Sequence, residues 1–167
     1  MRTQYQTMVS ERPPEYFSEW VWFANNLLNI DTSHDNALRA IIRAEQLAKN
    51  SWDWRVCAGF YANKLSNWES CRSSLNNAMV HSINTCQLIC CAHDWLKLLD
   101  DKHCAVKCMT EAESLATSTM EWLAITRFYH STQFSQDKVV YCLGMAASLT
   151  VTADDNVDVE LARIDYL

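Results

Sequence analysis

Glycine and proline are almost missing from this sequence, with two of each in 167 residues. Folds built from strands need tight turns, and these two residue types usually supply them. Their scarcity argues against a sheet and favours helices that are joined by short polar loops. Apolar residues make up 49% of the chain, which is enough for a buried core.

Long apolar runs are missing as well. No stretch approaches the ~20 residues that a membrane-spanning helix needs, and the N-terminal residues before Pro14 hold no apolar segment typical of a secretion signal. We therefore expect a cytoplasmic protein that does not bind membranes. Its net charge of -6 also argues against nucleic-acid binding, because phosphates would be repelled.

The sequence does contain an internal repeat, which four successive copies follow without a gap. Core-type residues recur at a period of 34, and a period of this size predicts supersecondary units that stack on one another. The repeated positions are Ala44, Ala78, Ala112 and Ala146; Trp20, Trp54, Leu88 and Trp122; Leu27, Tyr61, Trp95 and Tyr129; Ile41, Leu75, Met109 and Leu143; and Ala24, Ala58, Ala92 and Thr126.

Polar residues that cap helices recur at the same spacing. One set predicts the start of the second helix of each repeat, and a second set predicts the start of the first helix. In the second repeat these signals predict helices over 51–65 and 68–81. The two sets are Ser33, Asn67, Asp101 and Ser135, and then Ser51, Thr85 and Thr119.

The pattern resembles the tetratricopeptide repeat, whose two helices carry W-x2-L-G-x2-Y and A-x3-F at a period of 34. In the second repeat the first helix has Trp54, Cys57, Ala58 and Tyr61 at these positions. The chain departs from the family in lacking the proline that ends each repeat. It also has one more residue between the two helices and one fewer in the return loop. A generic stack of α-hairpins is the alternative.

The predicted fold is therefore all-α, a right-handed α-solenoid of four 34-residue helix-turn-helix repeats with a C-terminal capping helix. Residues 1–16 are expected to be a flexible segment, 17–153 the repeats and 154–167 an acidic helix. Its apolar stripe would be Val157, Leu161 and Ile164. A polar outer face at the last unit is typical of a cap, and the alternative is an acidic segment that occupies the protein's own groove.

The resemblance implies that a peptide or partner helix binds along the inner surface of the first helices. The positions expected there include the apolar Ile89 and Leu123, and they contain no acid, which favours an acidic ligand. The predicted groove residues are Asn25, Asn29, Arg55, Asn63, His93, Lys97, Arg127, His130 and Ser131.

Eight cysteines invite a metal or redox interpretation, most strongly around Cys86, Cys90, Cys91 and His93. No spacing there matches a common zinc module, and Cys57 and Cys91 occupy one core-like repeat position. Because free cysteine behaves as a small buried apolar residue, we expect core packing, with no metal and no cofactor. Nothing in the sequence forms a catalytic motif, so no catalytic residue and no enzyme activity is predicted.

Three functions follow, in decreasing order of support. The first is a non-catalytic protein–protein interaction module, an adaptor or chaperone-like scaffold that binds a protein or an acidic peptide. The second is a self-assembling structural homo-oligomer, such as a homodimer, that pairs through the ends of its solenoid or through exposed tryptophans. Trp22, Trp52 and Trp68 are the candidates because they lie outside the repeated tryptophan position. The third is a metal-binding or redox protein that uses the cysteines and histidines.

Overall fold

The computed structural model describes residues 14–29 and 34–167, and these residues form nine α-helices and no strand. The all-α prediction is confirmed. Ser33, predicted to cap a helix, and most of the N-terminal segment predicted to be flexible lie outside the described residues. The helices are α2 (Phe17–Leu28), α3 (Asp35–Glu45), α4 (Ser51–Leu65), α5 (Trp68–Val80), α6 (Thr85–Leu99), α7 (Lys102–Leu115), α8 (Thr119–Thr132), α9 (Gln136–Ser148) and α10 (Ala153–Tyr166).

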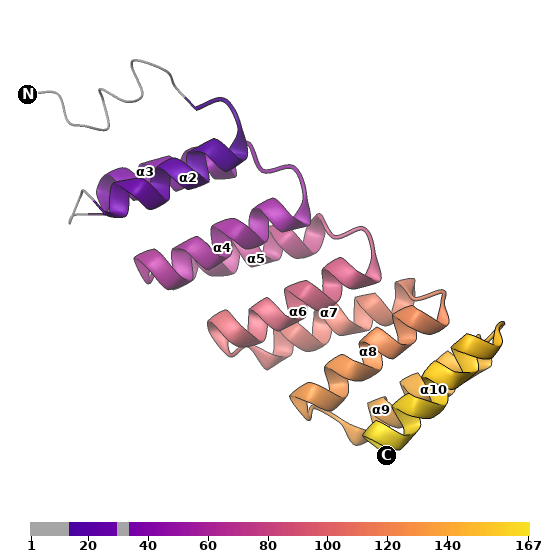
Figure 1. The fold of residues 1–167 in the computed structure, drawn as a ribbon. Helices are drawn as coiled ribbons and strands as arrows, with labels where there is room; N and C mark the ends of the chain where they lie inside the picture. The colour runs from indigo at the N-terminus through magenta and orange to yellow at the C-terminus, as the bar shows by residue number, and fades with distance from the viewer. Residues whose placement is uncertain (1–13, 30–33) are drawn as a thin grey trace, which may run out of the picture. The chain divides into compact units, whose positions relative to one another are not determined.

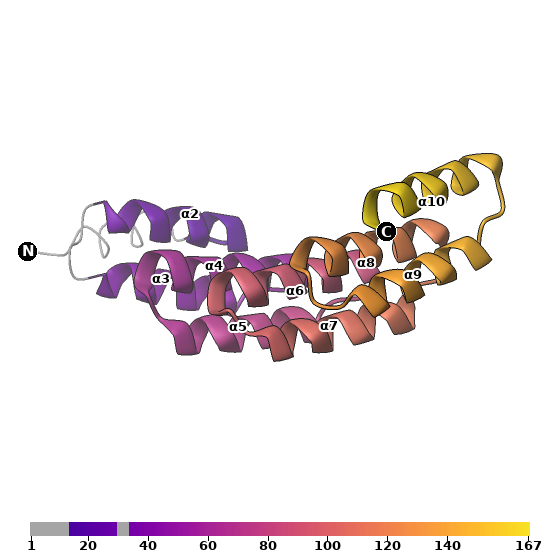
Figure 2. The same cartoon turned by 90° about the horizontal axis from the view of Figure 1, so that it is seen from below.

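The chain divides into two compact units, one that ends at His81 and one that begins at Ser82. In unit 1 the closest helix pairs are α2 with α3 and α4 with α5. In unit 2 they are α6 with α7 and α8 with α9, with α10 packed against both α8 and α9 (Figures 1 and 2). The four hairpins correspond to the four predicted repeats. We call the first helix of each hairpin an A helix and the second a B helix.

Small residues lie where the two helices of each hairpin meet. The repeated alanines of the B helices, Ala44, Ala78, Ala112 and Ala146, are fully buried. The repeated small position of the A helices is fully buried too, at Ala24, Ala58, Ala92 and Thr126. Side chains of this size allow two helix backbones to approach closely, and large neighbours such as Tyr61 and Trp95 fill the remaining core.

Three of the four B helices, α5, α7 and α9, begin where the sequence predicted, whereas α3 begins one residue later, with His34 and not Ser33 as its N-cap residue. Asn67, Asp101 and Ser135 each accept a hydrogen bond from the backbone N–H three residues later. This bond satisfies one of the donors that the first turn leaves free.

The predicted caps of the A helices were wrong by one residue. The capping side chains are Asn50, Asn84 and Ser118, which accept from the N–H groups of Asp53, Gln87 and Glu121. Ser51, Thr85 and Thr119 are instead the first helical residues, and their side chains are buried. Both residues of each adjacent pair have a side chain that can cap a helix, an amide or a hydroxyl, and only the backbone geometry shows which of them does so.

A third polar position, which sequence reasoning missed, recurs once per repeat in the A helices. The side chain there accepts backbone N–H groups from the residues that precede its helix, as in a capping box. Its members are Glu19, Asp53, Gln87, Glu121 and Asp155. These hydrogen bonds hold the pKa values of Glu121 and Asp155 below their usual range. Because Asp155 continues the series, α10 begins as a fifth A helix.

The apolar stripe predicted for the C-terminal helix is not the buried side of that helix. α10 is buried through Val159 (2% exposed) and Ala162 (7%), whereas Val157, Leu161 and Ile164 are 57%, 53% and 78% exposed. The side with Val159 and Ala162 is buried because it packs against α8 and α9.

Two glutamates tie neighbouring hairpins together, one in each unit. In unit 1 Glu45 accepts from the Tyr61 hydroxyl at 2.9 Å and the Ser74 hydroxyl at 2.6 Å. In unit 2 Glu113 accepts from the Tyr129 hydroxyl at 2.6 Å and pairs with Lys138 at 2.7 Å. We call these two groups the glutamate clamps.

Candidate functional site

All nine predicted groove residues lie on A helices or at their ends. In unit 1, Asn25 lies on α2 and donates to the Val21 carbonyl at 3.0 Å, and Asn29 is the C-terminal cap residue of α2. Arg55 is half-buried on α4 and Asn63 is exposed near the end of that helix. A ring contact between Phe17 of α2 and Trp52 of α4, with centroids 6.4 Å apart, joins the two A helices.

In unit 2 the predicted residues lie on two A helices that contact each other, α6 and α8. His93 and Lys97 come from α6, and Arg127, His130 and Ser131 come from α8; all five are exposed. Ser131 donates to the Phe128 carbonyl of its own helix at 3.2 Å. The structure therefore brings these five residues onto one pair of neighbouring helices.

Both histidines of this surface are held by rings of the next A helix. His93 of α6 lies edge-on to Phe128 of α8, with centroids 4.8 Å apart. His130 of α8 lies against Tyr166 of α10, with centroids 4.5 Å apart. These contacts restrict the imidazoles and fix which face of each A helix meets the following one.

The charge of this surface is basic. Lys97 and Arg127 are exposed, and neither forms an ion pair with another described residue. None of the nine predicted residues is a carboxylate. A surface of this kind can bind a carboxylate or phosphate group through hydrogen bonds to charged donors, which are stronger than those between neutral groups.

One predicted inner-face position is not available to a ligand. Leu123 of α8 is 1% exposed and belongs to the core of unit 2, whereas Ile89, at the same repeat position of α6, is half-buried. The sequence could not separate the two because both are aliphatic residues at one position of the repeat.

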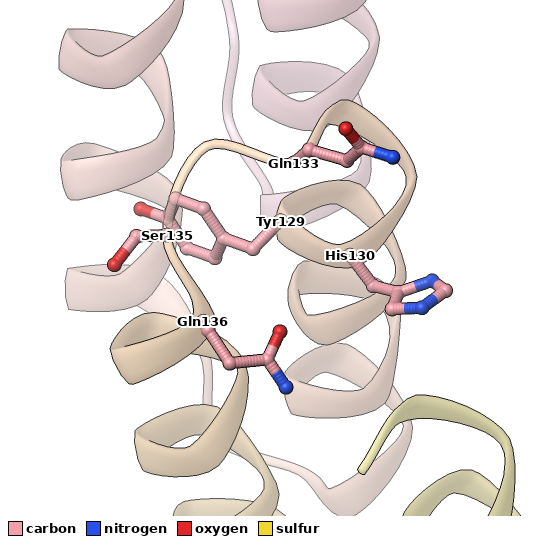
Figure 3. Close-up of a pocket in the computed structure, with 5 residues that line it drawn as sticks. All are labelled: Tyr129, His130, Gln133, Ser135 and Gln136. Atoms are coloured by element: carbon pink, nitrogen blue, oxygen red, sulfur yellow. The ribbon is translucent and has the colours of Figure 1, made fainter.

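A hollow of about 330 Å³ lies where α8 ends and α9 begins (Figure 3). Its lining comprises Tyr129, His130, Gln133, Ser135 and Gln136. In Figure 3 His130 and Gln133 extend from the end of α8, and Gln136 extends from the start of α9. The amide of Gln136 donates to the Tyr166 carbonyl at 3.1 Å, so the end of α10 is fastened beside the hollow.

Tyr166 and Gln136 are residues at this surface that sequence reasoning missed. The signal that could have found Tyr166 was the repeat period itself, which takes the cap Ser118 to Thr152 and Glu121 to Asp155. That shift places α10 beside α8 as the next A helix, and its last turn then reaches His130.

Five of the cysteines are core residues: Cys57, Cys71, Cys91, Cys108 and Cys142. At Cys108 and Cys142 burial is the largest reason that the thiol pKa rises, to about 12 in each case. Such thiols stay protonated near neutral pH, and the thiol is a poorer nucleophile and metal ligand than the thiolate. Across the described part of the chain no three His, Cys, Asp or Glu side chains come together as a candidate metal site.

The three tryptophans outside the repeat position are exposed: Trp22 by 63%, Trp52 by 60% and Trp68 by 53%. All three belong to unit 1. Exposed aromatic side chains are enriched at protein interfaces.

Comparisons of the chain with models of known families, with curated protein sequences and with solved structures gave no match. Among the helices of the described segments, none combines the length and apolar character that crossing a bilayer requires. The case for a function therefore rests on the surfaces of this chain.

Proposed function

We propose that this protein is a non-catalytic protein–protein interaction module, an adaptor or chaperone-like scaffold of tetratricopeptide type that acts in the cytoplasm. It binds an acidic peptide or helix of its partner along the exposed face of its A helices. The observation that carries the proposal is the basic surface of unit 2, where two contacting helices present Lys97, Arg127 and two histidines.

The physical basis is electrostatic complementarity within a stable scaffold. The histidines are oriented by ring contacts, so little of their conformational freedom would be lost on binding. Lys97 and Arg127 offer charged donors that described residues do not already use in ion pairs. Because the protein is acidic overall, acidic ligands would be steered toward this basic surface and repelled from the rest of the protein.

A charge-reversal pair tests the proposal within unit 2. The variant Lys97→Glu/Arg127→Glu and a control, Lys102→Glu/Lys107→Glu, change the net charge equally, but the control residues are exposed on the B helix α7. Partners captured from lysate would be identified, and the binding of one acidic peptide derived from them would be titrated by fluorescence anisotropy. We expect the first variant to lose about tenfold or more in affinity and the control to lose little. If both variants bind the acidic peptide with equal affinity, the proposal that this surface binds it is wrong.

Self-assembly is the second candidate because Trp22, Trp52 and Trp68 are exposed on unit 1. Sedimentation over a range of concentrations decides this candidate. A strict monomer removes it, whereas a dimer that Trp52→Ser and Trp68→Ser dissociate would support it.

A further inference from the structure

The C-terminal helix α10 has two apolar sides, and only one of them is covered. Val159 and Ala162 face unit 2 and are buried. On the opposite side Val157, Leu161 and Ile164 follow the i, i+4, i+7 spacing of one helix face, and each is more than half exposed. We call these three residues the α10 stripe.

Two residues of the α10 stripe, Leu161 and Ile164, lie at repeat positions where histidines of α6 and α8 contact the next A helix. Shifting Leu161 back by one and by two repeat periods gives Arg127 of α8 and His93 of α6. Shifting Ile164 back by one period gives His130. His93 packs on α8, and His130 packs on α10.

In α6 and α8 two histidines of this face touch the next A helix, although His93, Arg127 and His130 stay exposed. On α10 the equivalent face is apolar, and no described helix of unit 2 covers it. An exposed apolar helix face of this kind marks a site where one more helix can pack.

Acidic residues run along one side of the stripe. Asp154, Asp158 and Asp165 are exposed on α10, and none of them forms an ion pair with another described residue. The other side carries Glu160, which pairs with Arg163. A helix that packs on the stripe would meet this acidic border along its length.

We propose that α10 binds an amphipathic helix of another protein, with an apolar stripe bordered by Lys or Arg. The partner's apolar residues cover Val157, Leu161 and Ile164, and its basic residues pair with the acidic border. A second copy of this chain fits less well, because pairing α10 with α10 in antiparallel fashion brings the acidic borders together. The surface is separate from the basic groove of the proposed function and selects ligands of the opposite charge.

The probe is a short synthetic helical peptide with a leucine stripe bordered by lysines, titrated by fluorescence anisotropy against the full chain. The control peptide has glutamate in place of each lysine. We expect binding of the lysine peptide only, and protection of α10 from amide hydrogen exchange in its complex. If the two peptides bind alike, or the protection lies outside α10, the proposal is wrong.

Variants separate the apolar part of the site from the charged part. Leu161→Ser/Ile164→Ser should weaken the lysine peptide by at least about tenfold, because two aliphatic contacts are lost. Asp158→Lys/Asp165→Lys should reverse the preference toward the glutamate peptide. Ile83→Ser, at a residue that is 81% exposed but outside α10, is the matched control and should change neither affinity.

Since all these side chains are exposed, the variants should fold normally, and circular dichroism melting checks this. Unchanged binding by the Leu161→Ser/Ile164→Ser variant would overturn the proposal. A concentration-dependent dimer that this variant dissociates would assign the face to a second copy instead, which also overturns it. Loss of acidic-peptide binding by the groove variants bears only on the proposed function, so the two can fail separately.

Discussion

At the scale of single residues, the glutamate clamps stand out because they occur at every second repeat and not at every repeat. Glu45 and Glu113 are two repeat periods apart, and so are their partners Tyr61 and Tyr129. Burial, together with the neighbouring carboxylate, raises the pKa of each tyrosine, so both hydroxyls stay protonated and donate. At the intervening repeat position the chain has Met79, which cannot accept a hydrogen bond of this strength.

Replacing Tyr129 by Phe should lower the free energy of unfolding of unit 2 by about 1–2 kcal/mol, because the largely buried Glu113 loses one donor and keeps Lys138. Urea unfolding followed by tryptophan fluorescence measures the change. Tyr141→Phe is the control: this residue is half-exposed, and its hydroxyl makes no hydrogen bond with a described residue. Equal losses in the two variants would show that the clamp does not stabilise the unit.

At the scale of the helix, the boundaries follow from short polar sequences. Each A helix after α2 has an amide or hydroxyl cap and an acceptor three residues later, and both recur once per repeat. The cap lies one residue earlier than the hydroxyl position that the sequence suggested. At this hydroxyl position, the buried Oγ1 of Thr85 has no hydrogen-bond partner among the described residues, which lowers the stability of the protein.

This assignment predicts opposite effects at adjacent residues. Asn84→Ala removes the cap of α6 and should destabilise the protein by about 1 kcal/mol. Thr85→Val replaces an unsatisfied hydroxyl by a methyl group of similar size and should be neutral or stabilising. Thermal unfolding of both variants provides the comparison. If Thr85→Val lowers the stability more than Asn84→Ala does, Thr85 and not Asn84 is the cap of α6.

At the scale of the whole molecule, the chain comprises two compact units, each built of hairpins. α10 belongs to the second unit and covers part of α8 and α9. Val159 and Ala162 make it a cover of these helices, and its opposite side carries the proposed docking surface.

A chain that ends at Val151 should expose the surface of α8 and α9 that α10 covers. Amide hydrogen exchange should then become faster in these two helices and stay unchanged in α2–α5, since unit 1 has its own core. Mass spectrometry of peptic fragments measures this. Equal loss of protection in both units would contradict the division of the chain into two units.

The sequence by itself determined the helical class, the four hairpins and the identity of most core positions. It could do so because a constant repeat period places alanines such as Ala78 and aromatic residues such as Tyr61 at equivalent positions, and these packing rules are local. It also placed the predicted groove residues on A helices for the same reason. The same repeat explained buried cysteines such as Cys57 and Cys91 as core residues.

Only the tertiary structure decided which side of α10 is covered, because Val159 and Leu161 are equally apolar in a sequence. Burial depends on which side of the helix packs against α8 and α9, and these contacts form only in three dimensions. The same reason applies to Leu123, which is buried although its counterpart Ile89 is only half-buried. It applies as well to the two histidines, whose positions depend on rings from the next helix in space.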